Sequence, residues 1–407
     1  MSSPARWMVG CCVLLLTAYA SVQESEAQRE PAQSRASRPP AVPASPFAAS
    51  SPSTGPSASD PSAGAPGTTT AGLTPRQLAG QRVVYSYSGL TPPQSLLQDI
   101  RAGQAAGVIF FGANYHDPDQ FRAAVQTLRQ AQQQSPVHSP LLLMTDQEGG
   151  LIRRLPGAPE LSERQIGQTA PAAAAAAAQA GTGAGQNLTG FGLNVNLAPV
   201  LDVYDQPGNF IDQSQRSYAQ SPTSVATLGS AFIAAQQQAG VAATAKHFPG
   251  LGTAPTGQNT DTGPVTLAES LQQLRGTDEA PYPAAIGAGV KLVMLSWAVY
   301  PALDATRPAG LSPAVVQGEL RGRLGYDGVT VTDALEAGAL RAFGDTGQRA
   351  VGAASAGMDL LLCSAQDPGE GEQATDALAD ALSAGQLDQT GFSAAVDRVT
   401  ALRDGLH

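Results

Sequence analysis

The sequence is poor in cysteine. Of three cysteines among 407 residues, Cys11 and Cys12 lie in an N-terminal apolar stretch, which leaves Cys363 alone in the remainder. A disulfide framework is therefore excluded there, and a metal cluster built on cysteine is disfavoured. No other sequence pattern indicates a metal site or an organic cofactor, so neither is expected.

Basic residues and long apolar runs are also scarce. The chain carries 23 Lys and Arg against 33 Asp and Glu, a net charge of −10. Nucleic acid and anionic membrane surfaces would repel such a protein, so neither is an expected partner. The apolar run Trp7–Thr17 is shorter than the about 20 residues of a membrane span, so no stable span is predicted. No pattern indicates the oligomeric state.

The N-terminal residues resemble a secretory signal. Arg6 precedes the run Trp7–Thr17, and Ala18-Tyr19-Ala20 supplies the small residues that signal peptidase needs. Val9-Gly10-Cys11 faintly resembles a lipoprotein signal, but its cysteine precedes the leucines, so a lipid anchor is not expected. Residues 1–20 are therefore predicted to be a signal peptide and the protein to be secreted or associated with the cell envelope.

Residues 21–72 are rich in Ser, Pro, Ala, Thr and Gly and hold almost no large apolar side chains. Such a segment buries too little surface to offset its ordering entropy. It is predicted to be a disordered tether, and residues 73–407 are predicted to form the catalytic domain. Thr74 and Pro75 suit the cap and the first turn of an opening helix.

Short apolar runs then alternate with stretches long enough for helices, such as 121–133, 172–190 and 221–239. Each run is nearly continuous in apolar character, as a strand buried on both faces is. The runs are Val83–Tyr85, Val108–Phe111, Leu141–Met144, Leu193–Leu197, Val241–Thr244, Leu292–Leu295, Val329–Val331 and Leu360–Leu362. This alternation predicts an α/β fold, a (β/α)8 TIM barrel with a single catalytic domain, and a doubly wound open sheet is the alternative.

Polar residues follow several of these runs. They are Asp146 after the third, Asn196 and Asp202 around the fourth, Lys246 and His247 after the fifth, and Asp333 after the seventh. In a barrel all these strand ends open on the face that holds the active site. Any one of these residues could be an ordinary loop charge, and Asp333 could cap a helix. Their shared position favours one site.

Four segments carry a family resemblance. They are Asp146-Gln147-Glu148-Gly149-Gly150 with Arg153-Arg154, Gln215-Arg216-Ser217-Tyr218, Lys246-His247-Phe248-Pro249-Gly250, and Val331-Thr332-Asp333-Ala334-Leu335. In this order they resemble the single-domain β-N-acetylhexosaminidases of glycoside hydrolase family 3, from about Leu73 to the C-terminus. The resemblance implies a carbohydrate substrate, with terminal β-linked N-acetylglucosamine from cell-wall-derived or related glycans as the expected sugar. No residue that reads the N-acetyl group is evident, so β-glucosides stay open.

The resemblance also implies roles for individual residues. Asp333 matches the nucleophile that forms a covalent glycosyl-enzyme. The residues that match sugar-binding positions are Asp146, Arg154, Arg216, Lys246 and His247. Because cations such as Arg216 or Lys246 would lie nearby, Asp333 is expected to keep a low pKa and to stay ionised.

One departure concerns the proton donor. The family carries an Asp-Ser-His triplet in the loop after the Lys-His-Phe-Pro-Gly segment, and its histidine is the acid/base. Here Asp261 matches the aspartate, but Gly263 stands in place of the histidine. The leading hypothesis is a retaining glycosidase with Asp261 as the acid, provided that burial raises the pKa of Asp261. The alternatives are a secreted sugar-binding protein with weak or no turnover and, more remotely, an aldolase with Lys246 as a Schiff-base lysine.

Overall fold

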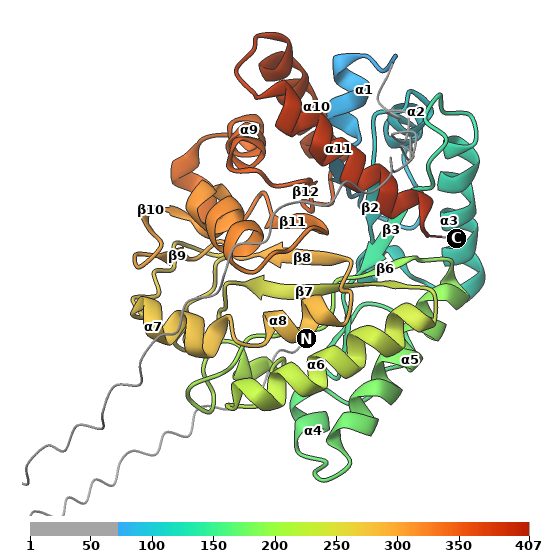
Figure 1. The fold of residues 1–407 in the computed structure, drawn as a ribbon. Coiled ribbons are helices and arrows are strands. Elements are labelled where there is room, and N and C mark those ends of the chain that lie inside the picture. Colours follow the sequence, from blue (N-terminus) through green and yellow to red (C-terminus); the bar gives the residue numbers. More distant parts are fainter. Residues whose placement is uncertain (1–71, 407) are drawn as a thin grey trace, which may run out of the picture. The chain divides into compact units, whose positions relative to one another are not determined.

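The structure, a computed structural model, describes residues 72–406 (Figure 1). The predicted signal peptide and all but the last residue of the predicted tether lie outside the described residues. The first helix, α1 (Pro75–Gly80), confirms the predicted cap. The Thr74 hydroxyl accepts from the backbone of Gln77, the Gln77 side chain accepts from the Thr74 backbone, and Pro75 is the first helical residue.

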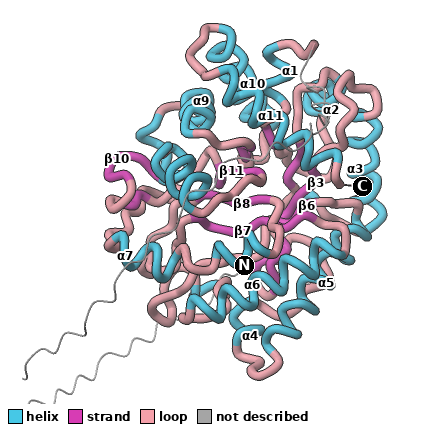
Figure 2. The backbone as a smooth tube through the Cα atoms, in the orientation of Figure 1, coloured by secondary structure: helices cyan, strands magenta, loops and turns pink. Residues whose placement is uncertain are grey.

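Eight parallel strands form a closed barrel. In order around the barrel they are β1 (Val83–Tyr85), β2 (Gly107–Ile109), β3 (Leu142–Thr145), β6 (Val195–Asn196), β7 (Ala242–Phe248), β8 (Leu292–Leu295), β11 (Val329–Ala334) and β12 (Leu360–Leu362). Every predicted strand is present, and Figure 2 shows them at the centre of the domain. Because β1 pairs with both β2 and β12, the sheet has no edge, and the open-sheet alternative is wrong.

Helices surround the strands. After α1 come α2 (Gln94–Arg101), α3 (Pro118–Gln132), α4 (Glu163–Gly167), α5 (Ala173–Phe191), α6 (Pro222–Gln238), α7 (Leu271–Gln273), α8 (Tyr282–Gly287), α9 (Thr346–Ala356), α10 (Pro368–Ser383) and α11 (Gln389–Asp404). The helices α3, α5 and α6 match the stretches that the sequence predicts. Within residues 72–406, no helix is long and apolar enough to cross a membrane.

The remaining elements are short. Two π-helical turns, η3 (Leu274–Asp278) and η5 (Ala314–Arg323), lie between β7 and β11. The 3-10 turns are η1 (Gly112–Asn114), η2 (Asp212–Ser214), η4 (Ala309–Leu311) and η6 (Gly338–Phe343), and the hairpins are β4 (Gln147–Gly149) with β5 (Ile152–Arg153) and β9 (Val299–Tyr300) with β10 (Asp304–Pro308).

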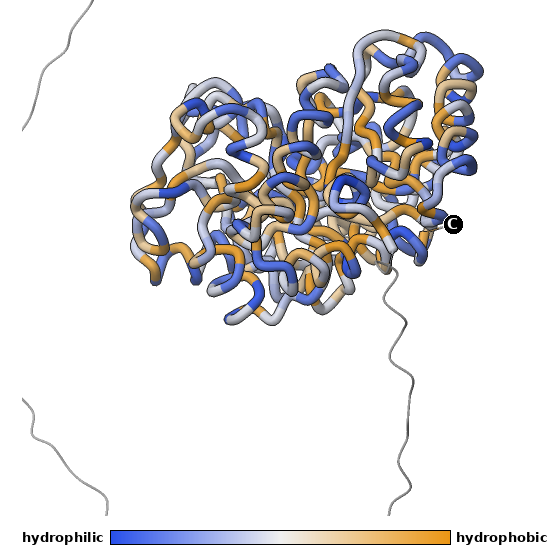
Figure 3. Tube along the Cα trace, turned by 90° about the horizontal axis from the view of Figure 1, so that it is seen from above, coloured by the Kyte–Doolittle hydropathy of each residue, from blue (hydrophilic) through white to orange (hydrophobic). Residues whose placement is uncertain are grey.

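Both faces of each barrel strand are buried, which explains the continuous apolar runs. On β1, Val84 belongs to the cluster inside the barrel, whereas Val83 and Tyr85 belong to the cluster between the strands and the helices. Figure 3 shows hydrophilic residues gathered along the outer helices and apolar residues towards the middle. The core is thus two concentric layers, and loops at the strand ends are left to carry the polar chemistry.

The helices α5 and α6 pack closely, since a glycine lets their backbones approach. A Cβ at Gly181 would lie 2.3 Å from the carbonyl oxygen of Phe232, closer than real contacts allow. A Cβ at Gly190, at the end of the same helix, would meet nothing within 4 Å. The helix contact therefore requires glycine at position 181 but not at position 190.

Candidate active site

The carboxyl ends of the barrel strands surround a cavity of about 450 Å³. All residues that the sequence predicts for the site line it, namely Asp146, Arg154, Arg216, Lys246, His247, Asp261 and Asp333. They come from different strands and from loops widely spaced in the sequence. The barrel therefore brings together the residues that were expected to converge at the carboxyl ends of its strands.

A second cavity, of about 470 Å³, lies at the opposite end of the barrel and does not share this character. Its wall includes Arg82, Arg321 and Arg398. Arg321 and Arg398 contact the buried Asp359 carboxylate at 2.6 and 2.7 Å. Asp359 thus holds both guanidinium groups next to the amino ends of β1 and β12, where barrel residues generally serve stability.

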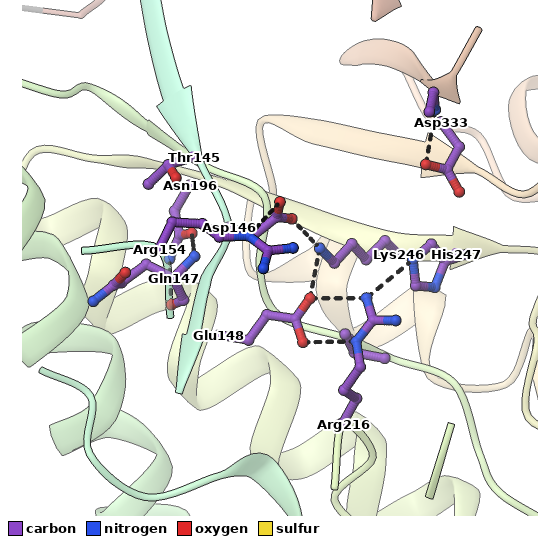
Figure 4. Close-up of polar contacts among 12 residues, drawn as sticks. Thr145, Asp146, Gln147, Glu148, Arg154, Asn196, Arg216, Lys246, His247 and Asp333 are labelled. Atoms are coloured by element: carbon purple, nitrogen blue, oxygen red, sulfur yellow. Dashed lines mark hydrogen bonds and ion pairs between the residues drawn. The ribbon is translucent and has the colours of Figure 1, made fainter. Parts of the chain in front are cut away.

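Two cations and two carboxylates form a hydrogen-bonded cluster on the floor of the site (Figure 4). The Lys246 ammonium donates to Asp146 at 2.8 Å and lies 2.7 Å from Glu148. The Arg216 guanidinium donates to both oxygens of Glu148, each at 2.9 Å. A guanidinium–carboxylate fork of this kind is geometrically specific and fixes both side chains.

The charges in this cluster hold one another in the ionised state. Burial alone would raise the pKa of Glu148, but Arg216 and Lys246 lower it to about 2. Burial alone would lower the pKa of Lys246, but Asp146 and Glu148 raise it above its ordinary value. Lys246 is therefore an ammonium at neutral pH. A Schiff base needs the neutral amine, so this geometry disfavours the aldolase alternative.

His247 is oriented by a buried carboxylate. Its Nδ1 lies 2.7 Å from Asp202, which also accepts from the backbone N–H of His247 and of Leu251. With the Nδ1 proton assigned to that contact, Nε2 is left as an acceptor, and it lies 3.4 Å from the Arg216 guanidinium. Asp202 thus sets the tautomer and the ring position of a residue that lines the cavity.

The sequence-based list of site residues omits Asp202 and Glu148. The position of Asp202 after the fourth strand and that of Glu148 inside the Asp-Gln-Glu-Gly-Gly segment were the available signals. Both are almost fully buried; Glu148 pairs with Arg216 and Lys246, and Asp202 orients His247. Arg154, by contrast, is partly exposed, and its Nε lies 3.7 Å from Asp146.

Asp333 lies on β11, away from the charged cluster (Figure 4). One carboxylate oxygen accepts from the backbone N–H of Ala334 at 2.8 Å. Because Asp333 is a strand residue and the next helical turn begins only at Gly338, the helix-cap interpretation is wrong. Its side chain faces the cavity as the nucleophile hypothesis requires.

The pKa expected for Asp333 is wrong in direction. Burial raises the pKa of this carboxyl above its ordinary value, and the charge of Asp261 adds to the rise, although His247 and Lys246 oppose it. The expectation treated Lys246 and Arg216 as uncompensated cations. Their charges are largely neutralised by Asp146 and Glu148, so they stabilise the Asp333 carboxylate only weakly.

The loop that carries Asp261 is fixed against the segment after β11. The backbone N–H of Gly338 donates to the Asp261 carbonyl at 2.8 Å, and that of Ala339 to the Thr260 carbonyl at 2.9 Å. This contact brings Asp261 to the cavity wall, yet its side chain is exposed. The burial on which the sequence argument depends is therefore not provided by the protein alone.

Gly263, in the position of the family's histidine, is not required for backbone reasons. It is not in the left-handed region, and a Cβ there would meet nothing within 4 Å. A larger side chain can therefore be accommodated. Within residues 72–406, no group of three or more His, Cys, Asp or Glu is arranged to hold a metal ion.

Comparison with known proteins agrees with this fold. Residues 77–402 match the family model for the glycosyl hydrolase family 3 N-terminal domain. The chain is 46% identical over 330 residues to an uncharacterized secreted glycosyl hydrolase of Arthroderma benhamiae, covering 81% of this chain and 93% of that protein. It is 31% identical over 371 residues to β-hexosaminidase A of Pseudoalteromonas piscicida, covering 82% of this chain but only 62% of that protein.

Solved structures show the same relationship. A family 3 β-N-acetylglucosaminidase from Paenibacillus sp. superimposes with a TM-score of 0.77 at 36% identity, covering 82% of this chain and 62% of that one. A β-N-acetylhexosaminidase from Beutenbergia cavernae superimposes with a TM-score of 0.71 at 33% identity, covering 82% of this chain and 98% of that one.

Proposed function

Because the chain belongs to glycosyl hydrolase family 3, we propose that it is a retaining glycosidase that removes terminal β-linked N-acetylglucosamine. Relatives named as β-hexosaminidases, and a structural relative named as a β-N-acetylglucosaminidase, support the choice of sugar. A relative named as a secreted glycosyl hydrolase supports export. Cell-wall-derived and related glycans are then the substrates within reach.

The main support for the proposal is that a candidate nucleophile and a cluster of charged side chains line the same cavity. Asp333 lies on one side, and the charged cluster of Lys246, Arg216 and their carboxylates lies on another. Charged groups make strong, directional hydrogen bonds, as the many hydroxyls of a sugar require. The cavity volume of about 450 Å³ is within the usual range for small-molecule sites.

In the proposed reaction Asp333 attacks the anomeric carbon as the bond to the leaving oxygen breaks, and water then releases the covalent glycosyl-enzyme. Asp146, Arg154, Arg216, Lys246 and His247 hold the sugar hydroxyls. Asp202 keeps His247 in one tautomer, and Glu148 keeps the two cations in place. Asp333 must be ionised to attack, so its raised pKa predicts loss of activity on mild acidification.

The leaving oxygen of a natural glycan needs a proton, and Asp261 is the donor that the motif comparison proposes. It lies on the cavity wall, and its negative charge helps to raise the pKa of Asp333. Its exposure argues against an efficient role, because a carboxylic acid donates best at neutral pH when it is shielded from water. A bound glycan would have to provide that shielding.

The second candidate function is a secreted sugar-binding protein of the same fold with weak or no turnover. The absence of histidine from the Asp261 loop favours it. Loss of a general acid typically slows a reaction by about 10²–10⁴-fold. Such a protein would still cleave aryl glycosides slowly, because their leaving groups need little protonation.

The test assays the purified protein against an aryl β-N-acetylglucosaminide and an unactivated disaccharide. Asp333→Asn is expected to abolish aryl cleavage without changing the melting temperature, whereas Asp327→Asn, at an exposed loop position, serves as the matched control. An Asp333→Asn variant with the parent rate and melting temperature would remove Asp333 from the nucleophile role. Aryl cleavage by the parent without disaccharide cleavage would favour the sugar-binding alternative.

Gly263→His tests the proton-donor position directly. If the chain lacks an efficient acid, restoring the histidine should raise disaccharide turnover while the aryl rate changes little, since the open surroundings of Gly263 leave room for the ring. If another acid already acts, the substitution should add nothing to either rate.

A further inference from the structure

The cavity at the amino ends of the barrel strands carries more positive than negative charge. Its volume is about 470 Å³, and the charged residues in its wall are Arg82, Arg321, Arg398 and Asp388. Behind the wall lies the buried carboxylate of Asp359, which contacts Arg321 and Arg398. Three guanidinium groups therefore face two carboxylates, and one positive charge is left in excess.

The Asp359 carboxylate has no capacity left for a further cation. One of its oxygens accepts from Nε and Nη2 of Arg398 at 3.0 and 2.7 Å. The other accepts from Arg321 at 2.6 Å, and from the backbone N–H and the hydroxyl of Thr330 at 2.8 and 3.1 Å. These contacts already occupy the roughly four lone-pair sites of a carboxylate.

Arg82, directly before β1, is the cation that lacks a carboxylate. It is only 1% exposed, and its Nε and Nη2 donate to the backbone carbonyls of Asp359 and Met358. Its guanidinium carbon lies 4.2 Å from the centre of the Phe392 ring. Burial lowers the pKa of Arg82 to about 10, although the charge of Asp359 opposes the change, and the charge of Arg398 adds to it. Arg82 therefore stays charged at neutral pH, with dipoles and a ring as its partners instead of an anion.

Hydrogen-bond donors remain available at the cavity wall. The Arg398 side chain is 30% exposed, and its Nη1 makes no hydrogen bond with residues 72–406. The Nη1 of Arg82 likewise makes none within that range. The Gln317 amide, from η5, lines the same wall, as does Gly391 in the first turn of α11. The amino end of a helix carries partial positive charge, so α11 adds to the positive potential of the cavity.

We propose that this cavity binds a small tetrahedral oxyanion, phosphate or sulfate, between the Arg82 and Arg398 guanidinium groups and the first turn of α11. The inference does not depend on the proposed glycosidase function, because the cavity lies at the other end of the barrel. Guanidinium groups make strong, charge-assisted hydrogen bonds to such ions. A bound ion supplies the negative charge that Asp359 cannot share, and it stabilises the folded protein by mass action.

Calorimetric titration with inorganic phosphate, at about pH 7.5 and constant ionic strength, measures the affinity, and thermal unfolding measures the stabilisation. Arg398→Gln is expected to weaken phosphate binding by at least about tenfold, because it removes a charged donor. Ser355→Glu, at an exposed position of the cavity wall, should weaken binding by at least about fivefold while all three arginines stay.

Ser383→Glu is the matched control for Ser355→Glu. Ser355 lies near the end of α9 and Ser383 ends α10, and both are exposed. Each hydroxyl donates to the carbonyl four residues earlier, at 2.8 Å for Ser355 and 2.7 Å for Ser383. Ser383 does not line the cavity, so Ser383→Glu should leave the affinity within about twofold of the parent.

Asp388→Asn tests the proposal in the opposite direction. Asp388 precedes α11 and caps it by accepting from the Gly391 backbone N–H at 2.6 Å. Asparagine caps a helix as well as aspartate does, so the substitution removes a negative charge from the wall and keeps the cap. Phosphate should bind at least about threefold more tightly, which damage to the fold cannot explain. Asp117→Asn, at the cap of α3, is the matched control and should change nothing.

Glycerol 3-phosphate, titrated beside inorganic phosphate, distinguishes an ester from the free ion. Tighter binding of either one, with the same response to Asp388→Asn, supports the site and identifies its source of oxyanion. Neither heat nor stabilisation from phosphate, sulfate or the ester at about 10 mM would overturn the proposal. Binding that Asp388→Asn and Ser355→Glu leave unchanged would place the anion elsewhere and overturn it too, as would equal effects of the control variants. If Arg398→Gln fails to fold, these two variants still decide.

Discussion

Replacing Asp278 by asparagine is expected to make the stability of the barrel less dependent on pH. Asp278 ends η3, is 2% exposed, and has neither carboxylate oxygen in contact with a donor among the described residues. Its acidic neighbours are Glu269, Asp202 and Glu279. Burial, followed by the charges of Glu269 and Asp202, raises its pKa from 3.8 to about 8.

The sign follows from proton binding. Between about pH 4 and pH 8 the folded protein keeps a proton on Asp278 that the unfolded chain has released, so the free energy of unfolding falls as pH rises. Each pH unit in that window corresponds to about 1.4 kcal/mol for one group. From pH 5 to pH 8 the loss is about 4 kcal/mol, and Asp278→Asn, which cannot ionise, should escape it.

Urea unfolding at each pH, followed by far-UV circular dichroism and by the fluorescence of the buried Trp297, measures this loss. The variant should match the parent near pH 5 and exceed it by about 4 kcal/mol near pH 8. Asp327→Asn, at an exposed position, should leave the pH dependence unchanged. If the difference between parent and Asp278→Asn changes by less than about 1 kcal/mol over this range, Asp278 is ionised or hydrated in the fold and the reasoning fails.

Other perturbations test the cluster, the helix contact and the N-terminal segment. Glu148→Gln removes one negative charge from beside two buried cations and should lower the free energy of unfolding, measured in urea, by about 3–5 kcal/mol. A change below about 1 kcal/mol would show that water solvates the two cations in place of the carboxylate. Gly181→Ala should destabilise by about 1–3 kcal/mol because its Cβ meets a backbone oxygen, while Gly190→Ala should stabilise slightly; equal effects would contradict the packing argument. Deleting residues 21–72 should leave the melting temperature and the sugar affinity unchanged, and a clear drop in either would show that this segment packs on the barrel.

The eight strands were predictable because burial on both faces leaves a simple signature in the sequence. The ends of the strands were harder to predict, because hydrogen bonds to neighbouring strands determine where each strand stops. The fifth run was expected to end at Thr244, but β7 continues to Phe248. The fourth was expected over Leu193–Leu197, but only Val195–Asn196 pairs as a strand. Apolar character marks where a strand lies, and pairing sets its length.

The site residues were predictable to the extent that strand ends and motif spacing identify them. Position after a strand is a property of the sequence once the barrel is expected, and it singled out Asp146, Lys246, His247 and Asp333. Partners were not predictable in the same way. Glu148 and Asp202 act by contacting residues about 50 to 100 positions away, and no local pattern specifies such a contact.

The sequence by itself determined the class of fold, the face on which the chemistry lies and the absence of histidine from the Asp261 loop. These three properties follow from the periodicity of apolar residues, the order of the strands and the identity of single residues, all of which are present in the sequence. Only the tertiary structure decided the charge states. Burial of Asp333 outweighs cations that Asp146 and Glu148 already neutralise, so its pKa moves opposite to the expectation. A pKa depends on burial and on neighbours that only folding creates.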